Sequence, residues 1–184
     1  MTTRPVLEIE PLDAFTRWPV AALPPFRLLP LHGGLTDLEL GAVAASVLSC
    51  NSWEDDDPRE FPAEDGLAIP GGLRVADHGS GTTVDPGCCS GLEDWQAWYE
   101  VAEGEAIWLG HDPTPELRFV GDSVRLRQDS ASPWLDLPRA GLPELLRGVR
   151  RELDGFLSAA SRWAVRAGCP GLVEAVGRGL APVG

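Results

Sequence analysis

The sequence feature that most constrains the fold is a long stretch of helical periodicity near the C-terminus. Apolar residues recur there at intervals of three and four, as Leu142, Leu145, Leu146, Val149, Leu153, Phe156, Leu157, Ala160 and Trp163. Pro143 suits the first turn of a helix, and Gly168 suits the position just after its end. The pattern predicts a helix of about 24 residues whose broad apolar stripe must pack against another layer. A further short helix is predicted in the tail, residues 171–184.

A series of short strands is predicted ahead of this helix. Turn residues separate runs of strand-forming residues at 73–75, 82–84, 106–109, 117–120 and 123–126. Two other helices are predicted at 37–49 and 90–101, each opened by a capping box (Thr36 with Glu39, and Ser90 with Glu93). Tight turns join the strands more often than crossover helices do. We therefore expect an α+β fold with a mostly antiparallel sheet and the long C-terminal helix packed on one face.

The first 35 residues differ in character from the rest. Five prolines occur from Pro11 to Pro30, inclusive. A short strand is predicted only at residues 6–10. The segment is nevertheless rich in apolar and aromatic residues, including Phe15 and Trp18. We expect residues 1–35 to form a Pro-rich arm packed on the body, within a single domain that spans 1–184.

Composition excludes several kinds of chemistry. The chain has no lysine, so all 15 of its basic residues are arginines. A phosphate-loop lysine, a Schiff base and a pyridoxal linkage are therefore excluded. The net charge of −13 disfavours nucleic-acid binding, which depends on neutralising phosphates. The sequence has neither a membrane-length apolar run nor a signal-like N-terminus, so we expect a soluble cytoplasmic protein that does not enter a membrane.

A dense acidic run is the main candidate for a partner-binding surface. The residues that we assign to this surface are Glu54, Asp55, Asp56, Asp57 and Glu60. Closely spaced carboxylates accelerate encounter with a basic protein by long-range attraction. The plainer alternative is a solvated loop that only increases solubility.

Four side chains could form a metal site. His78, Cys88, Cys89 and His111 would meet if the predicted strands pair, and zinc is the metal that such ligands favour. Against this, neighbouring residues of a strand point to opposite faces, so one ion would not easily take both cysteines. The alternatives are buried structural thiols, which are usual in a reducing compartment, and a strained vicinal disulfide.

An enzyme site is the second alternative, placed around 78–95 and 108–112. His111 and Asp112 could act as an acid–base pair, although the same residues also suit a capped turn. Trp95 and Trp98 stand three residues apart, which is typical of a stripe facing the core. Asp77, His78 and Ser80 are triad residue types, but they lie too close in sequence for triad geometry. Common hydrolase and nucleotide-binding motifs are missing, which favours a protein without enzymatic activity.

Three segments resemble the SUKH superfamily, many of whose bacterial members are immunity proteins against toxins. They are IPGGLRVADHGSG at 69–81, FVGDSVRL at 119–126 and ELDGFLSAASRW at 152–163. The resemblance implies a non-enzymatic protein that binds another protein. Together with the acidic charge, it leads us to expect an immunity or regulatory protein with a basic partner. The alternative is a metal-binding protein or a hydrolase-like enzyme.

Overall fold

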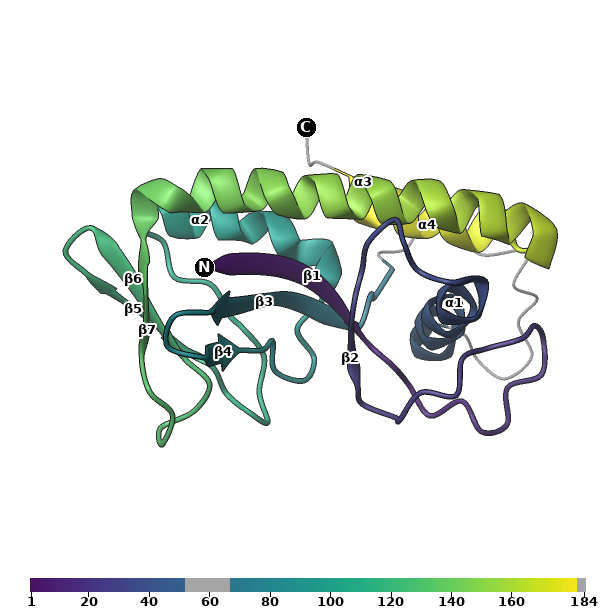
Figure 1. The fold of residues 1–184 in the computed structure, drawn as a ribbon, viewed down its shortest axis with the longest axis horizontal. Coiled ribbons are helices and arrows are strands. Elements are labelled where there is room, and N and C mark those ends of the chain that lie inside the picture. Colours follow the sequence, from purple (N-terminus) through teal and green to yellow (C-terminus); the bar gives the residue numbers. More distant parts are fainter. Residues whose placement is uncertain (52–66, 182–184) are drawn as a thin grey trace.

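The computed structural model describes residues 1–51 and 67–181. Two antiparallel sheets and four α-helices make up the fold, which confirms the expected α+β class (Figure 1). The larger sheet has the order β2-β1-β3-β4, with β1 Thr2–Glu8, β2 Leu28–Pro30, β3 Gly71–Asp77 and β4 Thr82–Val84. The smaller sheet has the order β5-β6-β7, with β5 Glu116–Val120, β6 Ser123–Arg127 and β7 Leu135–Pro138.

The helices include the long C-terminal one that the sequence predicts. They are α1 Asp37–Asn51, α2 Trp98–Glu103, α3 Leu142–Ala167 and α4 Pro170–Gly179, with short 3₁₀ turns η1 Leu92–Ala97 and η2 Arg139–Gly141. Helix α3 has 26 residues and ends at Gly168, whose φ of 76° provides the left-handed cap. Within the described part of the chain, none of the helices combines the length and the apolar character needed to cross a membrane.

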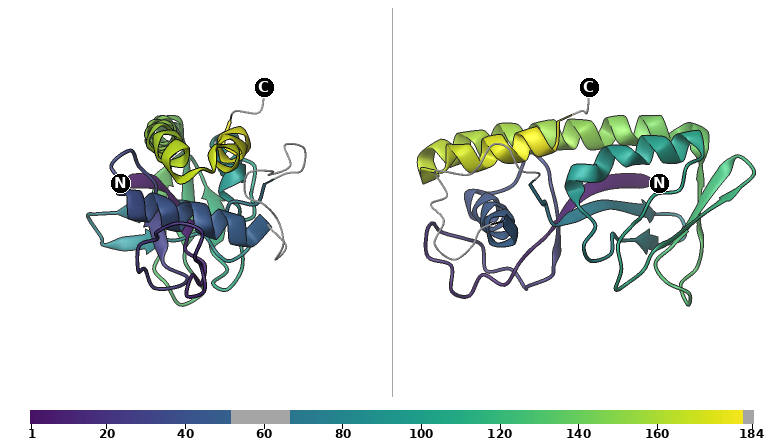
Figure 2. Two further views of the ribbon diagram at one scale, coloured as in Figure 1. Left: turned by 90° about the vertical axis from the view of Figure 1, so that its right-hand side faces the viewer. Right: turned by 180° about the vertical axis from the view of Figure 1, so that it is seen from behind.

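Helix α3 connects the two ends of the molecule. It runs past the sheets at one end and past α1 at the other, with α2 and α4 beside it (Figures 1 and 2). Its apolar stripe is buried, from Leu142 through Leu153 to Trp163. The stripe closes one continuous core to which both sheets and all four helices contribute. Burial of that stripe is the main reason why a helix of this length is stable.

The N-terminal segment is part of the sheet. Strand β1 lies between β2 and β3, and Val6 and Leu7 are almost completely buried. The strand therefore covers residues 2–8, whereas the sequence predicted 6–10. Pro5 lies within the strand, and β3 pairs with the chain on both sides of it. The rest of the segment packs through Trp18, whose indole nitrogen donates a hydrogen bond of 2.9 Å to the carbonyl of Gly41.

Two local predictions are wrong. Residues 106–109 form no strand. The Leu109 carbonyl accepts a 2.8 Å hydrogen bond from the Gly87 nitrogen, but the bridge that follows, between Cys88 and His111, is isolated. The predicted capping box at Ser90 does not form either. The N-cap there is Gly91, and the Glu93 carboxylate accepts a 2.8 Å hydrogen bond from the backbone nitrogen of Ile69 instead.

Candidate metal centre

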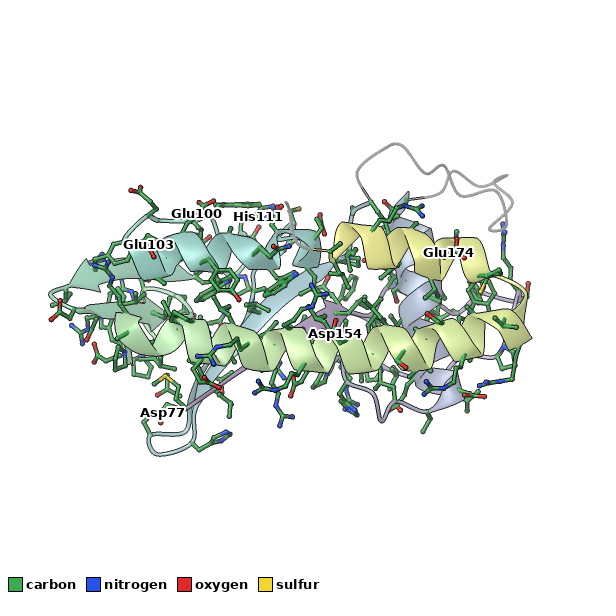
Figure 3. The ribbon with its side chains drawn as sticks, turned by 90° about the horizontal axis from the view of Figure 1, so that it is seen from above. Asp77, Glu100, Glu103, His111, Asp154 and Glu174 are labelled. Atoms are coloured by element: carbon green, nitrogen blue, oxygen red, sulfur yellow. The ribbon has the colours of Figure 1, made fainter. Side chains whose placement is uncertain are left out.

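Two loops that lie far apart in the sequence meet beside α2. One follows β4 and contains Cys88, and the other precedes β5 and contains His111. These two residues face each other across an antiparallel bridge and exchange backbone hydrogen bonds of 2.6 and 3.1 Å. Directly opposed residues of such a pair project their side chains to the same face. The backbone therefore brings a thiol and an imidazole together (Figure 3 labels His111, on the same side of the molecule as Glu100 of α2).

The loop that carries Cys88 is fixed at both of its ends. At its start, the side-chain amide of Gln128 accepts a 2.6 Å hydrogen bond from the Asp85 nitrogen and donates one of 3.2 Å to the Asp85 carbonyl. The Arg74 guanidinium also forms an ion pair with the Asp85 carboxylate. At its end, Leu92 donates a 2.8 Å hydrogen bond to the carbonyl of Ile69. The position of Cys88 is thus determined by the larger sheet and by β6.

Two glycines allow the loops to approach this closely. A Cβ atom on Gly87 would lie 2.7 Å from the backbone nitrogen of His111, and one on Gly110 would lie 2.6 Å from the carbonyl carbon of Gly87. Gly110 also has a φ of 95°, which side-chain-bearing residues rarely adopt. Each glycine immediately precedes a candidate ligand, so the pairs Gly87-Cys88 and Gly110-His111 are the sequence signal of this contact.

The conformation of Cys89 places both thiols on one side. Its φ is 62°, in the left-handed region, and its Sγ atom lies 3.3 Å from the Sγ atom of Cys88. The expectation that adjacent cysteines point to opposite faces is therefore wrong here. That rule holds for extended backbone, and the chain leaves the extended conformation at Cys89.

The result is a compact set of three metal-binding side chains. One ligand atom each from Cys88, Cys89 and His111 lies within 4.8 Å of the others, and all three residues are exposed. A tetrahedral zinc ion holds sulfur and nitrogen ligands about 3.5 to 3.8 Å apart. Side-chain movements of less than about 1.5 Å would bring the three atoms to those separations. These residues fit a zinc ion with three protein ligands.

Asp112 contacts one of the two nitrogens of the His111 imidazole. The Nδ1 atom of His111 lies 3.1 Å from the Oδ2 atom of Asp112. A carboxylate at this position favours the tautomer in which Nδ1 carries the proton and donates it to the carboxylate. The Nε2 atom is then left with a free lone pair. The same carboxylate–histidine arrangement orients the ligands of many metal sites.

The surroundings of Cys88 disfavour its thiolate form. The hydrogen bond that the Cys88 thiol donates to the Cys89 sulfur raises the pKa of Cys88 above its ordinary value, and partial removal from water adds to the effect. The negative charges of ionised Cys89 and of Glu8 act in the same direction. A metal ion would reverse this balance, because it binds the thiolate and releases the proton.

The other candidate residues lie elsewhere. His78 is at the turn after β3, where its Nε2 atom lies 3.1 Å from the Oγ1 atom of Thr2, and it does not join the cluster. Strand β3 pairs with β4 and β1, so the turn that carries His78 is directed away from the loop of Cys88. The remaining cysteines are separate. Partial removal from water and the neighbouring Glu10 carboxylate raise the pKa of the exposed Cys50 to about 12, and burial raises that of Cys169 to about 11.

The triad residue types near His78 form a turn. Ser80 donates a hydrogen bond of 2.7 Å through its Oγ atom to the Asp77 carboxylate, which also accepts one from its backbone nitrogen. These bonds lower the pKa of Asp77. His78 contacts Thr2 and neither of its neighbours in the proposed triad. The arrangement stabilises the connection from β3 to β4.

The acidic candidates Glu54, Asp55, Asp56, Asp57 and Glu60 lie outside the described residues.

Comparisons of the chain with protein-family models, with curated proteins and with solved structures give no match.

Proposed function

We propose that this protein binds one zinc ion through Cys88, Cys89 and His111. The single observation that carries the proposal is the convergence of their three ligand atoms within 4.8 Å. The paired backbones of the two loops hold Cys88 and His111 in place before any ion binds. Asp112 supplies the supporting carboxylate for the imidazole.

The donor set favours zinc over the hard cations. Thiolates and imidazole are the usual ligands of Zn²⁺, whereas Mg²⁺ and Ca²⁺ prefer oxygen. Three protein ligands leave the fourth tetrahedral position to water, as in catalytic zinc sites. A bound zinc ion would supply a Lewis acid there. Since all three residues are exposed, a solute could reach this position directly.

A titration of the metal-free, reduced protein with Co²⁺ followed by Zn²⁺ tests the proposal. We expect one equivalent to bind, with a thiolate-to-cobalt absorption band that zinc then removes. The variants His78→Ala and Cys50→Ser serve as controls, since neither residue belongs to the cluster. They should titrate as the unmodified protein does. A stoichiometry well below one, or no thiolate band, would refute the proposal.

The variant Asp112→Asn is expected to weaken zinc binding by about 10- to 100-fold. The change keeps the shape of the side chain but removes the charge that stabilises the Nδ1-protonated tautomer of His111. A competition titration against a chromophoric chelator measures the effect. Asp122→Asn, at the turn between β5 and β6, removes a carboxylate far from the site and should leave the affinity unchanged. Equal affinities for the two variants would show that Asp112 has no orienting role.

We also propose that the protein binds a basic protein partner, in the manner of the immunity or regulatory proteins that the SUKH resemblance implies. The observation that favours this second function is the net charge of −13, with a dense acidic run at residues 54–60. Such charge accelerates encounter with a basic surface and repels nucleic acid. A cytoplasmic location agrees with both proposals, because thiols stay reduced there.

The triple variant Asp55→Asn, Asp56→Asn, Asp57→Asn tests this second function, with an oligoarginine peptide as the probe. The association rate constant at low salt should fall several-fold, with a smaller change in the dissociation rate constant. The matched control is Glu100→Gln, Glu103→Gln, Glu105→Gln, which removes the same charge from the exposed side of α2 and its C-terminal end. If both triple variants associate equally fast, the acidic run has no special role.

A further inference from the structure

The two adjacent thiols of the candidate metal centre lie close enough to react with each other. The Sγ atoms of Cys88 and Cys89 are 3.3 Å apart. Two thiolates on one zinc ion are separated by roughly 3.8 Å, and the sulfur atoms of a disulfide by roughly 2 Å. The observed separation falls between these two values. The pair can therefore follow either of two courses, which are holding an ion and forming a disulfide.

The position of the pair allows an oxidant to reach it. Cys88 and Cys89 are both exposed, so a dissolved molecule has access to their sulfur atoms. The other two cysteines are placed differently. Cys169 is buried in the core, and the Cys50 thiol lies 3.5 Å from a carboxylate oxygen of Glu10. Cys88 and Cys89 are thus the two cysteines of this chain whose sulfur atoms are in contact.

A disulfide between neighbouring residues is easily reduced again. Successive Cα atoms are about 3.8 Å apart, whereas the Cα atoms of ordinary disulfides are usually about 4.4 to 6.8 Å apart. The ring that closes through the intervening peptide bond is therefore strained. Strained or exposed disulfides have more oxidising reduction potentials than structural ones, and they are the labile, regulatory kind.

Formation of this disulfide would remove two of the three candidate ligands. The thiolate is the form of cysteine that binds a metal, and a disulfide has none. His111 would then be left as a single ligand. The vicinal disulfide and the metal site, which the sequence offers as alternatives, become two states of one pair.

We propose that Cys88 and Cys89 form a reversible disulfide by exchange with a small-molecule disulfide such as oxidised glutathione, so that the chain holds zinc only in its reduced state. The effect on the metal rests on the zinc site proposed above, whereas the disulfide itself forms without an ion. The pair is thus an oxidation site that switches the metal centre.

The exchange takes place in two steps. The Cys89 sulfur, which accepts the hydrogen bond of the Cys88 thiol, attacks the oxidant as its thiolate and displaces one molecule of glutathione. The Cys88 thiolate then attacks the Cys89 sulfur of the mixed disulfide and displaces the second. Two electrons pass from the protein to the oxidant, and the two thiol protons end on the two molecules of glutathione. Excess reduced glutathione reverses both steps.

Equilibration of the metal-free, full-length protein with mixtures of reduced and oxidised glutathione tests the disulfide. After acid quenching and unfolding, free thiols are alkylated, counted by mass spectrometry and located in peptides. We expect all four cysteines to be alkylated in the reduced protein, and only Cys50 and Cys169 in the oxidised protein. Cys50→Ser, the control, should oxidise like the unmodified protein, whereas Cys88→Ser should stop at a mixed disulfide. Four free thiols in fully oxidised glutathione, or a dimer linked through Cys50, would overturn the proposal.

A zinc titration of the reduced and the oxidised protein tests the effect on the metal. Because two thiolates are lost, we expect the oxidised form to bind zinc more weakly by on the order of 10⁴-fold. Reduction of the same sample should restore the full affinity. If both forms bind zinc equally tightly, the switch is refuted although the zinc site stands. Absence of binding in both forms would refute the zinc site itself, and the switch with it.

Discussion

Replacing both Cys88 and Cys89 with serine is expected to reduce zinc affinity by on the order of 10⁴-fold. Structural zinc sites gain roughly 10 to 16 kcal/mol from four ligands, or about 3 kcal/mol for each ligand. Each lost thiolate therefore costs about 100-fold in affinity. Serine is nearly isosteric with cysteine but does not ionise at neutral pH. Since both thiols are exposed, we expect the fold to stay intact.

Competition with a chelator of known affinity measures this loss. Each single variant should fall between the unmodified protein and the double variant, because both thiols contribute a bond. Cys50→Ser is the matched control, as it removes an exposed thiol outside the cluster. If the double variant retains the affinity of the control, the two thiols are not ligands.

Replacing Trp163 with alanine is expected to lower the free energy of unfolding by about 3 to 5 kcal/mol. Trp163 is buried on α3, and its ring contacts that of Trp18 edge to face, with centroids 5.6 Å apart. It also lines, with Phe156, a small apolar cavity between α1, α3 and α4. Removal of the ring would enlarge that cavity and take away an aromatic partner of Trp18, whose ring also contacts that of Phe15. The loss therefore affects α3, α1 and the N-terminal segment together.

Urea denaturation followed by circular dichroism measures this effect. Val165→Ala on the same helix is the control, because Val165 is 73% exposed. Its stability should stay within about 0.5 kcal/mol of the unmodified protein. A loss of less than about 1 kcal/mol for Trp163→Ala would mean that α3 does not hold the N-terminal segment through this contact.

The elements that could be predicted from the sequence are those defined by local signals. Helix α3 follows from its apolar spacing, and the hairpin of β5 and β6 follows from its Gly121-Asp122 turn. Helix α1 begins at the expected capping box. The nitrogen of Thr36 donates a 2.8 Å hydrogen bond to the Glu39 carboxylate, and the Glu39 nitrogen donates one of 3.3 Å to the Thr36 hydroxyl. Each of these signals lies within the element that it specifies.

The parts that could not be predicted depend on distant segments or on unusual backbone conformations. The interior position of β1 depends on pairing with β3, about seventy residues later. The approach of Cys88 to His111 depends on the loop that carries Cys88, whose ends are held by Gln128 and Ile69. The left-handed conformation of Cys89 has no sequence signature, since non-glycine residues rarely adopt it. Because of these contacts and this conformation, Cys88, Cys89 and His111 converge, whereas the fourth predicted metal ligand, His78, lies elsewhere.

The tryptophans show how one pattern can have two roles. Trp95 and Trp98 are buried, as a core-facing stripe requires, yet parts of both side chains also line a small pocket beside η1 and α2. Trp108 was assigned to a predicted strand, whereas it lies exposed on a loop. A helix or strand pattern reports which side chains face inward. It does not report that Trp95 and Trp98 also line a small pocket together with the exposed Trp108.

X-ray absorption at the zinc edge of the loaded protein tests the central claim most directly. For ligation by Cys88, Cys89 and His111 with one water, we predict two sulfur atoms at about 2.3 Å from zinc. Two nitrogen or oxygen atoms should complete the shell at about 2.0 to 2.1 Å. A shell made only of nitrogen and oxygen, or one with a single sulfur atom, would contradict the proposed site.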